Sequence, residues 1–253
     1  MTEVHHGLEG VVAFETEIAE PDKEGSALRY RGVDIEEIVG RIPFEKVWGL
    51  LIDGAYDPGL PPAEPYNLAV HTGDVRVDVQ AAVAMLAPAF GMRQTYDISD
   101  EQAREDLSRV AVMVLSYAAQ SARGLDKPVV SQREVDKGAT LAERFMIRWK
   151  GEANPEHVKA IDAYWSSAAV QRTAHRTDGA GERGGAPSRV LGMIRDVEES
   201  GDAAAYVKGL LDKGERLMGF GHRVYRAEDP RARVLRRTAK ELNAPRRPRS
   251  AER

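Results

Sequence analysis

The segment GFGHRVYRAEDPRAR, residues 219–233, holds the residue types in this chain that are best suited to chemistry. Two flanking glycines let the backbone turn tightly near His222, whose imidazole can donate to a substrate carbonyl or transfer a proton. Asp229 can cap a helix that carries Arg231 in its first turn, where the guanidinium and the helix dipole both favour a carboxylate. Arg226, in the preceding loop, can take a phosphate or a second carboxylate. The pattern predicts a site for an anionic substrate, with the solvated start of a surface helix as the alternative.

A second glycine-rich turn, RGGAPSRV at residues 183–190, precedes another expected helix. Paired glycines before a helix can cradle an anion, and a plain loop-to-helix turn is the alternative. The turn lacks the Gly-Lys-Ser/Thr that would mark a nucleotide-binding P-loop. The six histidines show no metal-ligand spacing such as His-Glu-x-x-His, so no metal site is predicted.

The composition is that of an ordinary globular protein. The 253 residues carry a net charge of −4, which argues against a nucleic-acid partner in spite of a basic tail. Cysteine is absent, which excludes disulfides and cysteine nucleophiles and fits a reducing cytoplasm. The N-terminus lacks the features of a signal peptide, and the most apolar run, residues 110–119, is about half the roughly 20 residues of a membrane-spanning helix. We therefore expect a soluble, cytoplasmic protein with no membrane contact.

The hydrophobic pattern predicts a mainly α-helical fold with one small β element. Residues 10–32 are rich in β-branched residues around the turn PDKEGS, which is typical of a hairpin. The longest helix is expected over residues 98–124, with Asp100 as its N-cap and one apolar face. That face comprises Leu107, Val110, Val114 and Tyr117. Further helices are expected at residues 33–40, 44–54, 79–90, 133–151, 154–169, 187–199, 203–218 and 229–242.

Two segments break this pattern. Residues 170–185 lose the apolar periodicity and become rich in Arg, Gly, Thr and Ala, and the tail PRRPRSAER is basic in the same way. Such short basic segments are usually solvated or disordered. We therefore divide the chain into residues 1–169 with the hairpin and the large-domain helices, an irregular segment 170–185, residues 186–243 with partial active-site helices and a small domain, and the tail 244–253.

Three stretches together resemble citrate synthase, in the shorter bacterial type that includes 2-methylcitrate synthases. GLEGVVAFETEIAEPDKEGSALRYRGVDIEEIV is similar to the N-terminal hairpin and first helix of the family, and GGAPSRVLGMI resembles the glycine turn and helix of its active site. GFGHRVYRAEDPRAR is close to the family signature. The resemblance implies an almost entirely helical fold, an intertwined homodimer, and the condensation of acetyl-CoA with oxaloacetate to citrate and CoA. It implies no permanently bound cofactor, with acetyl-CoA as a substrate.

The resemblance also implies roles for three residues of the signature. His222 is the catalytic residue, and it hydrogen-bonds and polarises the carbonyl of oxaloacetate. Arg231 binds an oxaloacetate carboxylate, and Arg226 faces a phosphate of CoA. These roles agree with the anion site that the residues alone predict.

The chain departs from the family pattern in three places. Arg183 stands where the family has the histidine of Leu-His-Gly-Gly-Ala, which stabilises the enol of acetyl-CoA. A guanidinium stays charged near neutrality, so Arg183 cannot replace that histidine by proton exchange. The family segment His-x-x-Asn-Ala-Ser is replaced by the shorter VQRTAHRTDGAG, in which His175 lacks the family context and receives no role. The general base of the family, an aspartate, is expected beyond the end of this chain.

These departures predict an incomplete fold with impaired turnover. Both irregular segments are interpreted as out-of-frame or misassembled stretches, with the reading frame recovered at Gly184, and sequencing of the source DNA and transcript tests this hypothesis. The function is expected to be that of a citrate synthase-like acyltransferase. The alternatives are a non-catalytic remnant that binds CoA or dicarboxylate anions, and an inactive gene fragment.

Overall fold

A computed structural model describes residues 16–22, 24, 27–169, 186–215, 225 and 228–242. This part of the chain is mostly helical with a small N-terminal sheet, which confirms the predicted fold class. The division of the chain at residues 170–185 and 244–253 stays a prediction, because both segments lie outside the described residues.

The described elements follow one another along the chain in this order. They are β1 (Ala19–Pro21), β2 (Leu28–Tyr30), β3 (Val33–Asp34), α1 (Ile35–Ile38), α2 (Phe44–Asp53), α3 (Val75–Ala84), α4 (Leu86–Phe90), the 3-10 helix η1 (Thr95–Asp97), α5 (Asp100–Arg123), α6 (Gln132–Val135), α7 (Leu141–Lys150), α8 (Pro155–Ala168), α9 (Ala186–Ser200), α10 (Ala203–Asp212) and α11 (Pro230–Glu241).

The sheet is antiparallel, with strand order β1-β2-β3. In the register of the first pair, Ala19 lies opposite Tyr30. The predicted hairpin is therefore present, and a third strand follows where the sequence predicts the start of a helix. Arg31 and Gly32 adopt φ values of +45° and +83°, the left-handed pair of a tight turn, which brings Val33 back onto β2.

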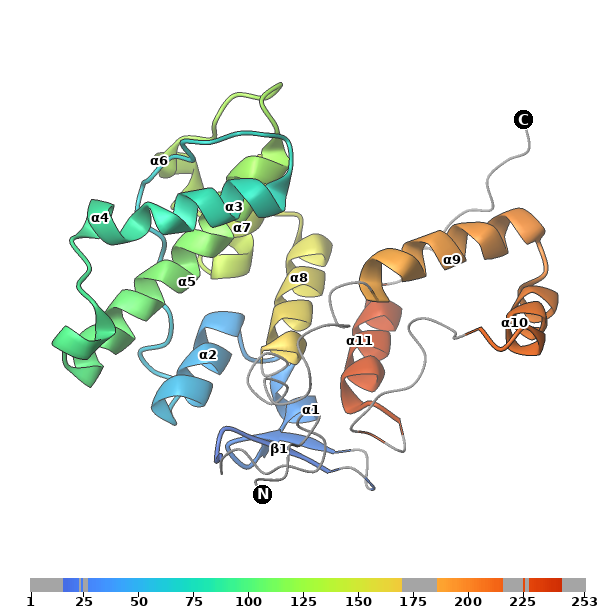
Figure 1. Ribbon diagram of the computed structural model, residues 1–253. Coiled ribbons are helices and arrows are strands. Elements are labelled where there is room, and N and C mark those ends of the chain that lie inside the picture. The colour runs from blue at the N-terminus through green and yellow to red at the C-terminus, as the bar shows by residue number, and fades with distance from the viewer. Residues whose placement is uncertain are drawn as a thin grey trace, which may run out of the picture.

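The helices form two packed groups that meet at α8. Figure 1 shows α3, α5 and α7 side by side, and these helices contact one another in pairs along α5. Helix α8 lies against α7 on one side and against α11 on the other, with α1 and the sheet below. Helices α9 and α10 pack on each other farther along the chain.

The main hydrophobic core lies where the sheet, α1, α2, α8 and α11 meet. Its fully buried members include Tyr30, Ile35, Ile38, Val47 and Ala163. A second cluster joins α3 and α4 to α5 around Met113 and Tyr117. Burial of these side chains supplies the main driving force for the arrangement, at about 25 cal/mol per Å² of apolar surface.

Two of the predicted helices are interrupted. The helix expected at residues 79–90 begins earlier, at Val75, and breaks at Met85 into α3 and α4. Pro88 explains the break, because a proline has no N–H and its ring collides with the carbonyl four residues back. The helix expected at 133–151 divides into α6 and α7 at Gly138, and Thr140 starts α7 with a capping box closed by Glu143.

The longest helix begins one residue earlier than the N-cap prediction implies, and its buried face is rotated. Ser99, not Asp100, is the N-cap, because its hydroxyl accepts from the backbone N–H of Gln102. Leu107 was expected to face inward and is 59% exposed. The buried face of α5 includes Met113 and Tyr117, which pack against α3 and α4, and Val112, which packs against Leu141 of α7. Small polar residues on that face allow close helix packing, which an apolar periodicity does not detect.

A buried carboxylate fastens the long irregular stretch before α3. Asp78 is fully buried, and it accepts hydrogen bonds from the backbone N–H and hydroxyl of Thr72 at 2.7 and 2.8 Å and from the hydroxyl of Ser121 at 2.6 Å. The Ser121 hydrogen bond is the largest cause that lowers the pKa of Asp78. The loop is therefore held between α3 and α5 by a charge that remains ionised.

The loop after α2 approaches that helix closely at Gly59. Gly59 has a φ of +73°, and a Cβ added there would lie 2.5 Å from the backbone oxygen of Glu45. Gly40 has a similar φ of +78° with nothing within 4 Å of an added Cβ. Gly40→Ala is expected to lower the free energy of unfolding by about 1–2 kcal/mol through backbone strain alone, and Gly59→Ala by about 1–3 kcal/mol more through the collision. Urea unfolding of both variants checks this. Equal losses in the free energy of unfolding would show that the loop moves away from Glu45 without an energetic penalty.

Asp162 of α8 caps α2 from another helix. Pro43 at the N-cap of α2 offers no side-chain acceptor, and Asp162 Oδ1 accepts from the backbone N–H of Phe44 at 2.9 Å. Burial raises the pKa of Asp162 to about 6, and the nearby carboxylate of Glu45 adds to the increase. Burial likewise raises the pKa of Glu45, whose Oε2 is buried without a hydrogen-bond partner within the described part of the chain.

This cap makes stability depend on pH. An acid whose pKa is raised by folding binds its proton more tightly in the folded state, so its stabilising contribution is greatest below about pH 4 and falls as the pH rises through 6. Asp162→Asn keeps an acceptor for Phe44 and removes the titration. Between pH 4.5 and 7.5 the wild type is expected to lose about 1–2 kcal/mol more than this variant in urea unfolding. The exposed Asp97→Asn serves as the control, and equal pH dependence in wild type and Asp162→Asn would contradict the assignment.

Candidate substrate-anion site

Helix α11 begins as the sequence predicts, with Asp229 as N-cap and Pro230 in the first position. The carboxylate of Asp229 accepts from the backbone N–H of Arg231 at 2.9 Å. Proline fits this position because its fixed φ suits a helix and its missing N–H would have no intrahelical partner. The cap therefore places Arg231 in the first turn of α11.

The same carboxylate holds the side chain of Arg231. The guanidinium donates from Nε to Asp229 Oδ1 at 2.9 Å and from Nη2 to Oδ2 at 2.6 Å. Two parallel hydrogen bonds between charged groups fix the plane of the guanidinium as well as its position. The Arg231 side chain is only 12% exposed. Asp229 thus has a second task beyond the cap that the sequence predicts.

The surroundings keep Arg231 charged. Burial works to lower the pKa of Arg231, but the hydrogen bond and charge of Asp229 outweigh it and hold the pKa above its ordinary value. The ring centroid of Tyr225 lies 5.9 Å from the guanidinium carbon, and burial raises the pKa of Tyr225 to about 12 against the opposing charge of Arg231. Arg231 is therefore a permanent cation in a poorly hydrated setting, with Asp229 as its counter-charge.

Tyr30 joins this site to the end of α8. It is fully buried in β2, and its hydroxyl donates to the backbone oxygens of Ser166 and Ser167, each at 3.1 Å. Tyr30 also contributes to the raised pKa of Arg231. The partners Tyr30 and Ser166 are 136 residues apart, so no local pattern in the sequence indicates this residue.

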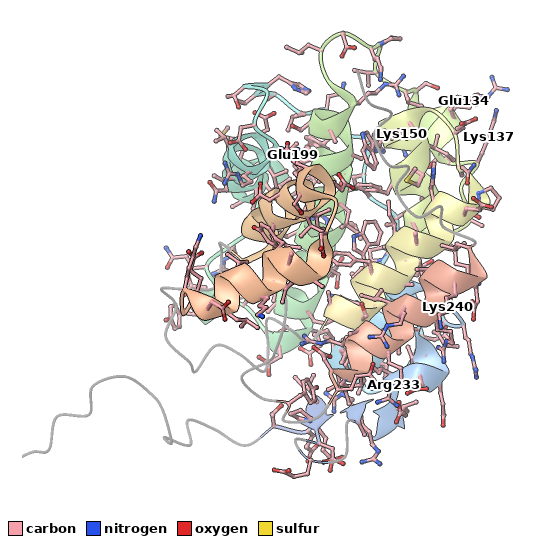
Figure 2. The ribbon with its side chains drawn as sticks, turned by 90° about the vertical axis from the view of Figure 1, so that its right-hand side faces the viewer. Glu134, Lys137, Lys150, Glu199, Arg233 and Lys240 are labelled. Carbon is pink, nitrogen blue, oxygen red and sulfur yellow. The ribbon has the colours of Figure 1, made fainter. Side chains whose placement is uncertain are left out.

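The other arginines of α11 form surface ion pairs. Arg233 Nη1 lies 2.7 Å from Glu36 Oε1, and Arg236 Nη1 lies 2.8 Å from Glu228 Oε1. Figure 2 shows Arg233 and Lys240 pointing outward from α11. The arginine-rich run therefore combines one buried cation, Arg231, with solvated charges on the rest of the helix. The predicted anion site applies to Arg231, and the alternative of a solvated surface helix applies to Arg233 and Arg236.

Of the three predicted site residues, the structure places Arg231. His222 and Arg226 lie outside the described residues, as do Arg183 and His175, so their roles stay predictions. Sequence reasoning missed the positioning roles of Asp229 and of Tyr30. An aspartate two residues before an arginine at a helix start was the available signal for the first of these.

The described residues also show whether a metal cluster or a membrane-spanning helix is present. No group of three or more His, Cys, Asp or Glu side chains there is arranged to hold a metal ion. No single helix in this part is long and apolar enough to cross a membrane, although one bent pair, Val75–Ala84 with Leu86–Asp97, meets the length and composition test.

The sequence matches one family model, that of the citrate synthase C-terminal domain, over residues 7–169 and 179–251. The chain belongs to the citrate synthase family. This confirms the resemblance carried by the three quoted stretches. The gap in the match, residues 170–178, lies inside the irregular segment 170–185. The match resumes before Gly184 and extends into the basic tail. The frame boundary at Gly184 and the separate tail therefore stay predictions.

Curated citrate synthases align with nearly the whole chain. A Mycobacterium tuberculosis protein named "Putative citrate synthase 2" is 56% identical over 264 residues, which cover 95% of this chain and 71% of that protein. The citrate synthase of Haloferax volcanii is 29% identical over 286 residues, covering 92% of this chain and 73% of that protein. Both alignments are longer than the 253 residues of the chain, so these citrate synthases carry residues within the aligned region that this chain lacks.

Solved citrate synthases share the fold. The Thermotoga maritima enzyme superposes with a TM-score of 0.65 at 23% identity, covering 94% of this chain and 73% of that chain. The Thermoplasma acidophilum enzyme, solved as a ternary complex with carboxymethyl coenzyme A and oxaloacetate, gives a TM-score of 0.70 at 18% identity, covering 96% and 74%. The chain is thus an enzyme by family, with the mainly helical citrate synthase architecture.

Proposed function

We propose that this protein is a citrate synthase-like acyltransferase that retains the oxaloacetate half of its site. One observation carries the proposal: Arg231 is a buried, permanently charged guanidinium, oriented by Asp229 at the start of α11. A planar cation of this kind suits one carboxylate of a small dicarboxylate. Its position in the GFGHRVYRAEDPRAR signature supports oxaloacetate as the ligand.

The remaining roles follow from the signature. His222 hydrogen-bonds the carbonyl of oxaloacetate and polarises it for attack, and Arg226 contacts a phosphate of CoA. Acetyl-CoA is then the second substrate, with no permanently bound cofactor and no metal. The methyl carbon of the acetyl group loses a proton and forms a bond to the carbonyl carbon of oxaloacetate, whose oxygen takes up a proton. Water then hydrolyses the thioester, which releases citrate and CoA.

Turnover in this chain is impaired. Arg183 occupies the position of the family histidine that stabilises the enol, and a guanidinium does not release its proton near neutral pH. The interruption of the family match at residues 170–178 supports a shortened segment directly before this position. A non-catalytic binder of oxaloacetate or CoA is therefore the second candidate function, favoured by the combination of Arg231 with Arg183.

Calorimetry and a thiol assay separate these functions. Oxaloacetate is titrated into the whole chain, CoA is titrated into the saturated complex, and thiol release from acetyl-CoA is followed in the same preparation. Binding with thiol release above background supports the enzyme, and binding without release supports the binder. The absence of oxaloacetate binding by a cooperatively melting sample would overturn both and leave the inactive fragment.

Two further features of the family are proposed for this chain. A homodimer is supported by large apolar side chains exposed on α3 and α5, where Val77 is 46% exposed and Leu107 59% exposed. Sedimentation of the calorimetry sample at several concentrations tests it. A cytoplasmic location is supported by the absence of cysteine, and no nucleic acid or membrane partner is proposed.

A further inference from the structure

A second buried cation lies far from Arg231, in the group formed by α5, α6 and α7. Arg148 of α7 is only 5% exposed, and its Nη2 donates to the side-chain oxygen of Gln132 at 3.0 Å. Within the described part of the chain no carboxylate lies in ion-pair distance of its guanidinium. Burial therefore lowers the pKa of Arg148 below its ordinary value. A buried charge with only a neutral partner is costly, so such a group calls for a counter-ion.

The nearest carboxylate is already occupied. Asp136 Oδ1 accepts from Arg144 Nη1 at 2.7 Å and from Gln132 Nε2 at 2.9 Å. Gln132 thus lies between Asp136 and Arg148 and hydrogen-bonds to both. Its neutral amide does not balance the charge of Arg148. The two arginines, one helical turn apart on α7, share one acid, which leaves one positive charge uncompensated.

The charged residues of the outer face do not supply the missing anion. Glu134 forms an ion pair with Lys137 at 2.5 Å. Figure 2 shows both side chains at the edge of the molecule, Glu134 on α6 and Lys137 in the turn that follows it. Their charges balance each other in solvent, where a surface pair has little effect on a buried group.

A small cavity borders Arg148. Its volume is about 20 Å³, and the polar side chains in its wall are Arg144, Arg148 and Ser116. Ser116 Oγ accepts from Gln120 at 3.1 Å, so its own hydrogen remains to be donated. The rest of the wall is apolar, with Val112, Leu115, Val135, Leu141 and Phe145 among the lining residues. The guanidinium groups of Arg144 and Arg148 and the hydroxyl of Ser116 therefore border a mostly apolar cavity.

We propose that this cavity binds one halide ion, chloride in the cell, against the guanidinium of Arg148. The space that a water-sized particle can occupy there is small, which favours a monatomic anion over carboxylates, phosphate and other anions of several heavy atoms. A water molecule would fit the space but leaves the charge of Arg148 unbalanced. A halide balances that charge, accepts from Arg144 and Ser116 as well, and tolerates an apolar wall. The site is independent of the proposed function, because it shares no residue with the Arg231 site.

Thermal unfolding in chloride tests the proposal on the whole chain. Sodium gluconate is exchanged for sodium chloride at constant ionic strength, since gluconate is too large for the cavity. At chloride concentrations about 20 times the dissociation constant, the melting temperature of the wild type is expected to rise by about 4–7 °C. Arg148→Met fills the same space without a charge, and it is expected to fold and to lose the rise.

The matched control is Lys150→Met, which removes an exposed cation from the same helix, labelled in Figure 2, and should retain the full rise. Ser116→Ala is expected to shift the chloride titration to higher concentration, which keeps the proposal testable if Arg148→Met does not fold. Anomalous diffraction from crystals soaked in bromide should give one peak next to Arg148. A melting temperature that does not respond to chloride, or an equal rise in Arg148→Met, would show that the cavity holds only water.

Discussion

Thiol release from acetyl-CoA and oxaloacetate is expected to remain about 10²–10⁴-fold slower than in a citrate synthase with histidine at the position of Arg183. The histidine of Leu-His-Gly-Gly-Ala stabilises the enol in the family, and the guanidinium of Arg183 stays protonated through the reaction. The thiol release that remains is the rate that binding and orientation of oxaloacetate provide without stabilisation of the enol. The measurement is a colorimetric thiol assay at saturating oxaloacetate, with hydrolysis of acetyl-CoA in its absence as background.

Arg183→His is the informative variant for this prediction. A rise in thiol release toward the rate of the family member assigns the loss to this side chain. An unchanged rate, with oxaloacetate binding intact, shows that another of the departures from the family pattern limits turnover. A wild-type rate equal to that of the family member would contradict impaired turnover altogether.

Arg231→Gln is expected to weaken oxaloacetate binding by about 100-fold or more. A partly buried charged hydrogen-bonded pair typically contributes 2–5 kcal/mol to binding, and glutamine retains neither the charge nor the fork of donors. Calorimetry measures the affinity, and protection by oxaloacetate against thermal unfolding provides a second readout. The variant also leaves Asp229 without its partner in a site where the Asp229 side chain is only 22% exposed, so a loss of stability is expected as well.

Two further variants separate binding from stability. Arg231→Gln with Asp229→Asn removes both charges and keeps the helix cap, because asparagine caps as well as aspartate. It should regain stability without regaining affinity. Arg233→Gln, two residues along the same helix, removes surface ion pairs with Glu36 and Glu228 and should bind oxaloacetate within about twofold of wild type. Unchanged affinity in Arg231→Gln would remove the oxaloacetate site from α11.

Helix starts with short-range signals were predictable from the sequence. Asn154 before Pro155 and Asp229 before Pro230 mark the starts of α8 and α11, since a cap and a first-turn proline act within three residues. The breaks at Met85 and Gly138 were missed, because the apolar periodicity continues across them. Leu107 was placed on the wrong face because burial of α5 depends on which helices lie beside it.

The candidate site was also predictable only where its signals are local in the sequence. Arg231 was identified because its position at a helix start is a local property. The fork formed with Asp229 and the buried hydroxyl of Tyr30 depend on side-chain directions and on contacts between distant parts of the chain. No pattern within a short window of sequence contains that information.

The cap that Asp162 provides to α2 has a consequence for synthesis on the ribosome. Its partner Phe44 emerges 118 residues earlier, so the first turn of α2 lacks this acceptor until α8 has left the exit tunnel. Tyr30 waits in the same way for the backbone oxygens of Ser166 and Ser167. The N-terminal sheet and α2 therefore reach their final state late, although they are made first, and a nascent chain that stops before α8 exposes unfinished N-terminal structure to chaperones and proteases.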